Sequence, residues 1–154
     1  MGYRNLFMPK TFLTHSAEET RNLGKKLARE IRQGALVCLS GDLGAGKTTF
    51  VQGFLESLGA TRPYTSPTFV IMKQYDLPAP VNGIERVYHV DAYRVSAPDL
   101  TAIGFTEWCA DQRGVVLLEW PERVKNLISR EAICINFISK EENEREIIIR
   151  RGFL

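Results

Sequence analysis

Gly41-Asp42-Leu43-Gly44-Ala45-Gly46-Lys47-Thr48 fits the phosphate-binding (Walker A) pattern G-x-x-x-x-G-K-[ST] at every specified position. The flanking residues supply the context that this pattern requires. Residues 35–39 form an uninterrupted apolar run, which is typical of a strand buried on both faces. Phe50, Phe54 and Leu58 recur at the spacing of one helical face. We therefore predict a strand, a phosphate-binding loop and a helix, in that order.

The residue types in this loop suit a nucleotide bound with magnesium. Glycines allow positive φ and a close approach of the backbone, so that successive N–H groups can converge on phosphate oxygens at the start of a helix. Lys47 is placed to reach the terminal phosphates and Thr48 to ligate Mg²⁺. The alternative, a glycine-rich turn with a surface lysine, does not explain the strand and helix around it. The candidate nucleotide-binding residues of the loop are Gly41, Asp42, Leu43, Gly44, Ala45, Gly46, Lys47, Thr48 and Thr49.

The composition is that of an ordinary globular protein. The 154 residues fit a single domain over 1–154, and 20 basic against 18 acidic side chains neither support nor exclude a nucleic-acid partner. No apolar run approaches the length of a membrane span, and the first ten residues lack the apolar core of a signal peptide. The three cysteines have no C-x-x-C spacing, so we expect reduced thiols and a cytoplasmic location.

Apolar patterns along the chain alternate between strands and helices. We expect strands over residues 11–14, 35–39, 69–75, 84–93, 115–119, 133–138 and 145–151. Ser16 and Glu19 form a capping box at the start of a helix, and residues 77–83 are expected to be a turn-rich connection. This alternation predicts an α/β fold of three layers, like that of P-loop NTPases, with a mainly parallel central sheet and a C-terminal β-hairpin. Ligands of such sheets bind beyond the carboxyl ends of the strands.

Further polar groups lie near the ends of expected strands. The hydroxyl-rich segment 65–68 could be a switch that senses magnesium or the γ-phosphate, or an ordinary surface loop. His89 and Asp91 share one face of a strand and could position water or metal, or could pack the sheet end as an ion pair. Glu119 ends an apolar strand where P-loop enzymes carry a magnesium-binding acid, usually Asp. The Trp120 indole could flank a nucleotide base or fill a crevice.

Four motifs together resemble the TsaE (YjeE) family of small bacterial ATPases. They are the phosphate loop, Thr65-Ser66-Pro67-Thr68-Phe69, His89-Val90-Asp91-Ala92-Tyr93-Arg94 and Glu119-Trp120-Pro121-Glu122-Arg123. The resemblance implies a role in making threonylcarbamoyladenosine, next to the anticodon, in tRNAs that read codons beginning with adenine. It implies that the chain is the ATP-hydrolysing partner of the TsaB–TsaD heterodimer, touches tRNA only through that complex and has no membrane contact. We expect a monomer when the chain is isolated.

The resemblance also implies a role for each site residue. Lys47 binds phosphates, Asp91 orients or activates the attacking water, and Thr68 is the nucleotide-sensing switch residue. Thr48 and Glu119 hold Mg²⁺. The sequence leaves open whether Asp91 or Glu119 lies nearer the metal.

The implied nucleotide is ATP. Guanine specificity usually comes with an N-K-x-D element, which is absent from the sequence, and the resemblance places Trp120 near the adenine.

Phosphoryl transfer depends on positive charge near the developing negative charge. Arg94 is a candidate for that charge but could equally pair with a local carboxylate. We therefore expect ATP hydrolysis to be slow in the isolated chain and faster when partners dock.

Two rival functions would use the same phosphate loop. A small-molecule kinase needs an acceptor pocket and commonly a mobile lid, for which the chain has little spare length. A nucleotide-switched binding module would bind ATP without releasing phosphate. Direct RNA binding would need a basic, aromatic stripe, whereas the arginines of this sequence are dispersed.

Overall fold

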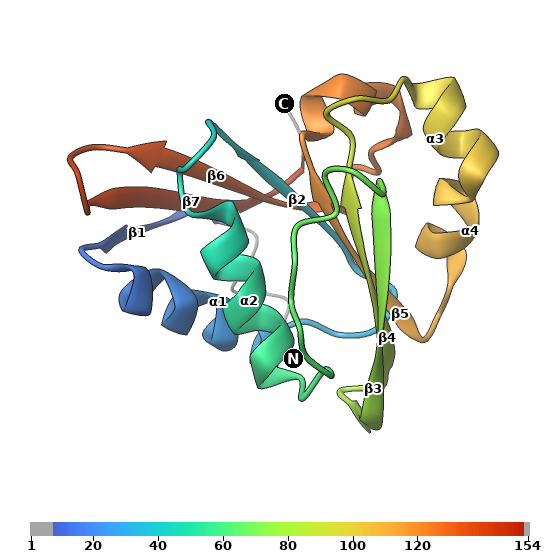
Figure 1. The fold of residues 1–154 in the computed structure, drawn as a ribbon, viewed down its shortest axis with the longest axis horizontal. Coiled ribbons are helices and arrows are strands. Elements are labelled where there is room, and N and C mark those ends of the chain that lie inside the picture. The colour runs from blue at the N-terminus through green and yellow to red at the C-terminus, as the bar shows by residue number, and fades with distance from the viewer. Residues whose placement is uncertain (1–7, 153–154) are drawn as a thin grey trace.

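Seven strands form one sheet in the computed structural model, which describes residues 8–152. The prediction that no signal peptide is present concerns the first ten residues. Residues 1–7 of that segment lie outside the described range. The strand order is β1-β7-β6-β2-β5-β4-β3 (Figure 1). The strands are β1 (Lys10–Thr14), β2 (Leu36–Gly41), β3 (Met72–Val81), β4 (Ile84–Asp91), β5 (Gly114–Glu119), β6 (Ile133–Ser139) and β7 (Arg145–Arg151).

The sheet is mixed. Its four central strands β6, β2, β5 and β4 pair in parallel, whereas β3 on one side and β7 and β1 on the other pair antiparallel. The prediction of a mainly parallel sheet therefore holds only for the central strands. The physical reason is the length of the connections, because the short β3–β4 and β6–β7 connections cannot hold the crossover that parallel pairing needs. The predicted C-terminal hairpin is confirmed as β6 and β7.

The predicted strand over residues 69–75 is wrong at its start, and the predicted turn over 77–83 is wrong over most of its length. Strand β3 begins at Met72 and runs through the expected turn to Val81. It contains Pro78 and Pro80, which lack the N–H that a central strand must donate. They are tolerated because β3 is an edge strand, and its register shifts between Asp76 and Val81.

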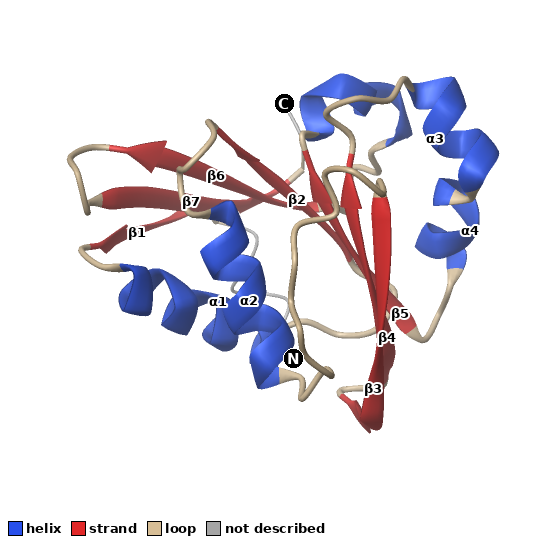
Figure 2. Ribbon diagram, in the orientation of Figure 1, coloured by secondary structure: helices blue, strands red, loops and turns tan. Residues whose placement is uncertain are grey.

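Helices cover both faces of the sheet (Figure 2). One face carries α1 (Ala17–Glu30) and α2 (Lys47–Ser57), and the other carries α3 (Ala97–Ile103), α4 (Phe105–Ala110) and the 3₁₀ helix η2 (Pro121–Leu127). Alternate side chains of each buried strand point to opposite faces. Leu117 accordingly packs with the first group of helices and Leu118 with the second, which gives two apolar cores. No helix within residues 8–152 is long and apolar enough to cross a membrane.

The N-terminus of α1 shows a modified form of the predicted capping box. The Ser16 hydroxyl accepts a hydrogen bond from the Glu19 N–H at 3.1 Å, as predicted. The Glu19 carboxylate, however, accepts from the N–H of His15 at 2.6 Å and not from that of Ser16. Both hydrogen bonds satisfy backbone donors near the start of the helix, which fixes where α1 begins.

Two glycines allow α1 and α2 to approach closely. A Cβ atom at Gly24 would lie 2.1 Å from the carbonyl oxygen of Phe50, and one at Gly53 would lie 2.0 Å from the carbonyl oxygen of Arg21. Real Cβ atoms are essentially never found so close to another heavy atom. These helices therefore pack backbone against backbone, and α2, which follows the phosphate loop, is held firmly against α1.

We expect Gly24→Ala to destabilise the protein, although the same change in an exposed helix stabilises it by up to about 1 kcal/mol. Overpacking of a tight contact costs about 1–3 kcal/mol, which outweighs that gain. Urea unfolding measures the change. The matched control is Asn22→Ala, on the exposed side of the same helix, which should alter the free energy of unfolding by less than about 0.5 kcal/mol. Equal stability of the two variants would contradict the close contact.

Candidate functional site

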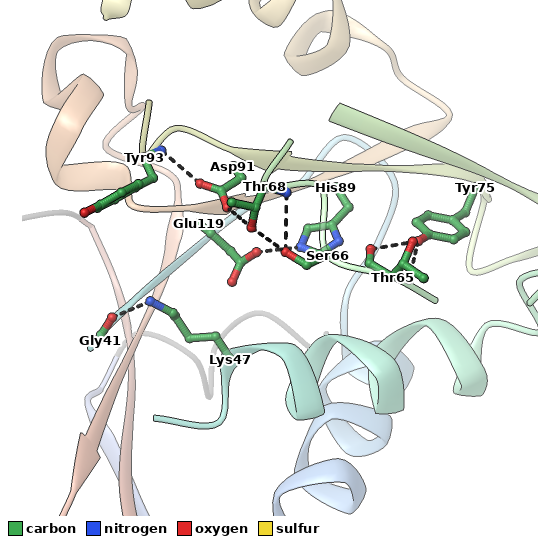
Figure 3. Close-up of polar contacts among 10 residues, drawn as sticks. All are labelled: Gly41, Lys47, Thr65, Ser66, Thr68, Tyr75, His89, Asp91, Tyr93 and Glu119. Atoms are coloured by element: carbon green, nitrogen blue, oxygen red, sulfur yellow. Dashed lines mark hydrogen bonds and ion pairs between the residues drawn. The ribbon is translucent and has the colours of Figure 1, made fainter. Parts of the chain in front are cut away.

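The carboxyl ends of the central parallel strands meet at one edge of the sheet. In the strand register, Leu39 of β2 pairs with Glu119 of β5, and Glu119 pairs with Asp91 of β4. Strand β2 ends at Gly41 and leads directly into the phosphate loop. The two predicted acidic residues, which are separated in sequence, are therefore direct neighbours beside that loop. Figure 3 shows Asp91 and Glu119 on the side of the sheet end that also holds Lys47.

A pocket of about 320 Å³ opens at this edge. It brings together most of the residues that the sequence singled out, from the loop and from three other segments. Its lining residues are Leu43, Gly44, Gly46, Lys47, Thr48, Thr49, Ser66, Thr68, Asp91, Tyr93, Arg94, Glu119 and Trp120. Gly41, Asp42 and Ala45 of the predicted set do not line it. A second cavity of about 410 Å³ lies near the amino ends of β2 and β6, away from these residues.

The backbone of the loop is shaped for an anion. Gly44 and Gly46 have φ values of 77° and 106°, which side chains other than glycine rarely adopt. At Gly41, with φ of 146°, a Cβ atom would also lie 2.6 Å from the Phe137 carbonyl oxygen. Gly46 is the N-cap of α2 and has no side chain to occupy the N–H groups of the first turn. Those N–H groups remain available to an anion at the positive end of the helix.

Lys47 is buried against an aromatic ring. The residue is 5% exposed, and its Nζ donates a hydrogen bond to the Gly41 carbonyl oxygen. Nζ also lies 4.0 Å from the centre of the Trp120 ring. Burial lowers the pKa of Lys47, although the charges of Glu119 and other nearby carboxylates oppose that shift. In this arrangement the Lys47 ammonium contacts the Gly41 carbonyl oxygen and the Trp120 ring.

Trp120 has an unusual backbone conformation. Its φ of 60° and ψ of 49° lie in the left-handed region, which bulky residues seldom occupy. Such strain persists only where the surrounding structure imposes it, and it clusters at functional sites. The ring packs against Tyr93, with 4.9 Å between ring centres. The Trp120 ring therefore contacts both Lys47 of the phosphate loop and Tyr93, which follows β4.

Asp91 is held through both of its carboxylate oxygens. The Thr68 hydroxyl donates to Oδ2 at 3.0 Å, and the Tyr93 N–H donates to Oδ1 at 2.9 Å. The Ser66 and Thr68 hydroxyls lie 2.6 Å apart. The segment 65–68 is thus tied to the end of β4 by its predicted switch residue, so it is more than a loosely attached surface loop.

Sequence reasoning missed the residues that anchor this segment at its other end. The Tyr75 hydroxyl accepts a hydrogen bond from the Thr65 N–H at 3.2 Å and donates to the Thr65 carbonyl oxygen at 3.4 Å. Lys73 donates to the Thr65 hydroxyl. Lys73 and Tyr75 are two residues apart on β3, so they share a face. Their alternation in the sequence is the signal that could have identified them.

His89 and Glu119 form a buried pair. Nε2 of His89 lies 3.0 Å from Oε2 of Glu119, and the two residues are 2% and 4% exposed. The two polar residues predicted to act together at the end of β4 therefore have different partners. His89 contacts Glu119, whereas Asp91 contacts Thr68. Arg94 lines the pocket with its guanidinium 5.1 Å from the centre of the Phe69 ring.

The donor atoms in the pocket suit magnesium. Mg²⁺ prefers oxygen ligands and is usually bound through one or two carboxylates together with phosphate oxygens and water. Thr48, Asp91 and Glu119 offer such oxygens. Within residues 8–152 there is no cluster of three or more His, Cys, Asp or Glu side chains that could hold a metal alone. A magnesium ion here would share its coordination between these oxygens, phosphate oxygens and water, as Mg²⁺ usually does.

Comparison with known proteins identifies relatives of the chain. The family model described as "Threonylcarbamoyl adenosine biosynthesis protein TsaE" matches residues 14–147. The tRNA threonylcarbamoyladenosine biosynthesis protein TsaE of Bacillus subtilis (strain 168) is 39% identical over 134 residues, which cover 87% of this chain and 80% of the relative. The protein of the same name from Treponema pallidum (strain Nichols) is 35% identical over 138 residues, covering 89% and 97%.

A solved structure is similar as well. The crystal structure of Bacillus subtilis YdiB matches with a TM-score of 0.78 and 33% sequence identity, over 95% of this chain and 87% of that one. The match supports the α/β architecture with its mixed sheet over nearly the whole chain.

We expect the fluorescence of Trp120 to report ligand binding at the loop, because phosphates would draw the Lys47 ammonium away from the indole ring. The variant Trp108→Phe leaves Trp120 as the single tryptophan, since the chain has two. Addition of Mg²⁺ and ATP should then change the emission saturably. Calorimetric binding of ATP with no change in Trp120 emission would show that Lys47 and Trp120 stay in contact.

Proposed function

Because this chain belongs to the TsaE family, we propose that it is a magnesium-dependent ATPase that supports threonylcarbamoyladenosine modification of tRNA. The family description and the names of its relatives place the family in the biosynthesis of this modified nucleoside. The observation that carries the proposed activity is the pocket of about 320 Å³ at the carboxyl ends of the strands. A phosphate loop, a buried lysine and two carboxylates from adjacent strands all line it or border it.

The loop residues provide the nucleotide site in this proposal. Backbone amides of the phosphate loop that line the pocket surround the phosphates, and the Lys47 ammonium leaves the Gly41 carbonyl to bind the terminal ones. Thr48 and Glu119 hold Mg²⁺, which, when bound, neutralises charge on the β- and γ-phosphates. Trp120 flanks the adenine after the phosphates have drawn the Lys47 ammonium away from its indole ring. The low exposure of Lys47 strengthens its attraction to phosphate, because little water competes for the charge.

Asp91 orients the attacking water in the proposed reaction. The hydrogen bonds from Thr68 and from the Tyr93 N–H fix the plane of its carboxylate. A base that is already oriented loses little entropy in reaching the transition state. Thr68 links this carboxylate to the segment 65–68, so the switch residue contacts the water-orienting residue directly. Lys47, Asp91 and Thr68 form the proposed catalytic set.

The partner in the proposal is the TsaB–TsaD heterodimer, and tRNA is reached only through that complex. Arg94 is the arginine among the pocket-lining residues, and its guanidinium stacks on the exposed Phe69 ring. Without an arginine at the γ-phosphate, hydrolysis lacks a contribution that is worth about 10³–10⁵ in rate. Docking of partners would supply or reposition that charge, so that ATP turnover is slow in the isolated chain.

The experiment that tests the function measures phosphate release by the chain alone and with the purified TsaB–TsaD heterodimer. We expect release to be slow alone and to rise when the heterodimer is added. Asp91→Ala should bind ATP with nearly the wild-type affinity yet lose at least about 100-fold in stimulated turnover, the usual contribution of a positioned base. Retained hydrolysis in that variant would assign the role to Glu119.

Two variants provide controls for the binding step. Lys47→Ala should weaken ATP binding by roughly 10- to 100-fold, since a charge-assisted hydrogen bond contributes about 1.5–3 kcal/mol. Lys10→Ala, which removes an exposed lysine from the distant β1 strand, should leave binding unchanged.

Fast turnover by the isolated chain that partners do not alter would contradict partner dependence. Transfer of phosphate to a small acceptor would indicate a kinase, and ATP binding with no phosphate release in the complex would indicate a nucleotide-switched binding module.

A further inference from the structure

The imidazole of His89 makes its polar contact through one nitrogen. Nε2 lies 3.0 Å from Oε2 of Glu119, whereas the buried Nδ1 has no hydrogen-bond partner within residues 8–152. An ionised carboxylate can only accept hydrogen bonds, so Nε2 is the donor of this pair. The ring is 2% exposed. The hydrogen bond from Nε2 therefore links the His89 ring to Glu119.

Stability alone does not account for this buried pair. Taking a carboxylate and an imidazole out of water is costly, and the loss is repaid only when the remaining polar atoms are also satisfied. Among residues 8–152, no group forms a hydrogen bond with Nδ1 of His89. The neighbours of His89 on β4 include the buried Val87 and Val90, and an apolar residue at position 89 would suit such surroundings at least as well. A role at Glu119 explains why an imidazole is present.

The two carboxylates of the site differ in how many of their oxygens are engaged. Asp91 accepts hydrogen bonds at both oxygens, from Thr68 and from the Tyr93 N–H. Glu119 accepts one side-chain hydrogen bond, at Oε2. Its other oxygen faces the side of the pocket that holds Lys47 and Gly41 (Figure 3). A carboxylate locked through one oxygen and open at the other is oriented to bind a cation.

We propose that His89 is the positioning residue of Glu119, the carboxylate that the proposed function assigns to the magnesium ion. The inference rests on the proposed function. Through its hydrogen bond, His89 holds the Glu119 carboxylate in one orientation, with its open oxygen toward the phosphate loop. Asp91, with both oxygens occupied, is left to orient water. His89 itself touches neither nucleotide nor metal.

The test compares His89→Ala, His89→Asn and His89→Gln. The Gln amide can place a donor near the position of Nε2, whereas the shorter Asn amide corresponds to Nδ1 and cannot reach Glu119. For each variant, calorimetry gives the ADP affinity with Mg²⁺ and with a chelator, and the ratio of the two affinities measures the magnesium coupling. We expect the Ala and Asn variants to lose about 10- to 100-fold in this ratio, the usual cost of removing such a partner. His89→Gln should recover most of the loss.

Kinetics and a double variant provide independent readouts. In the presence of the TsaB–TsaD heterodimer, His89→Ala should lower kcat more than it raises KM for ATP. Glu119→Gln should lower the magnesium coupling by itself, and adding His89→Ala to it should lower the coupling no further, because His89 acts through Glu119. Should His89→Ala fail to fold, the magnesium coupling of His89→Gln compared with that of His89→Asn still tests the positioning role.

The matched control is Tyr88→Phe, at the preceding position on β4. Tyr88 is 8% exposed and its hydroxyl donates to Asp111 at 2.6 Å, in the core on the opposite face of the sheet. Its removal should lower stability and leave the magnesium coupling unchanged. Magnesium coupling equal to wild type in all His89 variants, or a Gln variant as deficient as the Ala variant, would overturn the positioning role. Absence of magnesium-dependent ADP binding in the wild-type chain would instead overturn the proposed function.

Discussion

The parallel pairing of β2, β5 and β4 is the constraint on which the rest of the structure depends. It places Leu39, Glu119 and Asp91 in one row across the sheet. Strand β2 is central, with neighbours on both sides, and its end is where the chain turns into the phosphate loop. A shift of one residue in the β4–β5 register would turn one of the two carboxylates toward the opposite face. The position of the loop relative to both acids is therefore a consequence of strand pairing.

The two carboxylates have different surroundings although they are neighbours. Asp91 is connected to the segment 65–68, which is in turn anchored to β3, so its position depends on a loop. Glu119 is connected to His89 inside the sheet, so its position depends on buried strands. One carboxylate is therefore linked to buried strands and the other is linked to a loop. Such a division suits a site in which one group holds a metal and the other follows the state of the nucleotide.

The sequence predicted the centre of the site better than its surroundings. The pattern at residues 41–48, with a buried strand before it and a helical period after it, is local information. The position of Glu119 followed from the run of four apolar residues, 115–118, that it ends. The start of β3 was not predictable in this way, because the tolerance of Pro78 and Pro80 depends on β3 being an edge strand, which is a property of the whole sheet. The backbone contact at Gly24 and Gly53 and the contact between Lys47 and Trp120 also join segments distant in sequence.

The most direct test of the central claim is a crystal structure of the chain with Mn²⁺ and a non-hydrolysable ATP analogue, in which anomalous scattering locates the metal. The account predicts one Mn²⁺ coordinated by Thr48, Glu119 and phosphate oxygens, with the β-phosphate surrounded by the amides of the phosphate loop. A metal bound away from Glu119, or an analogue bound in the cavity near the amino ends of β2 and β6, would contradict it.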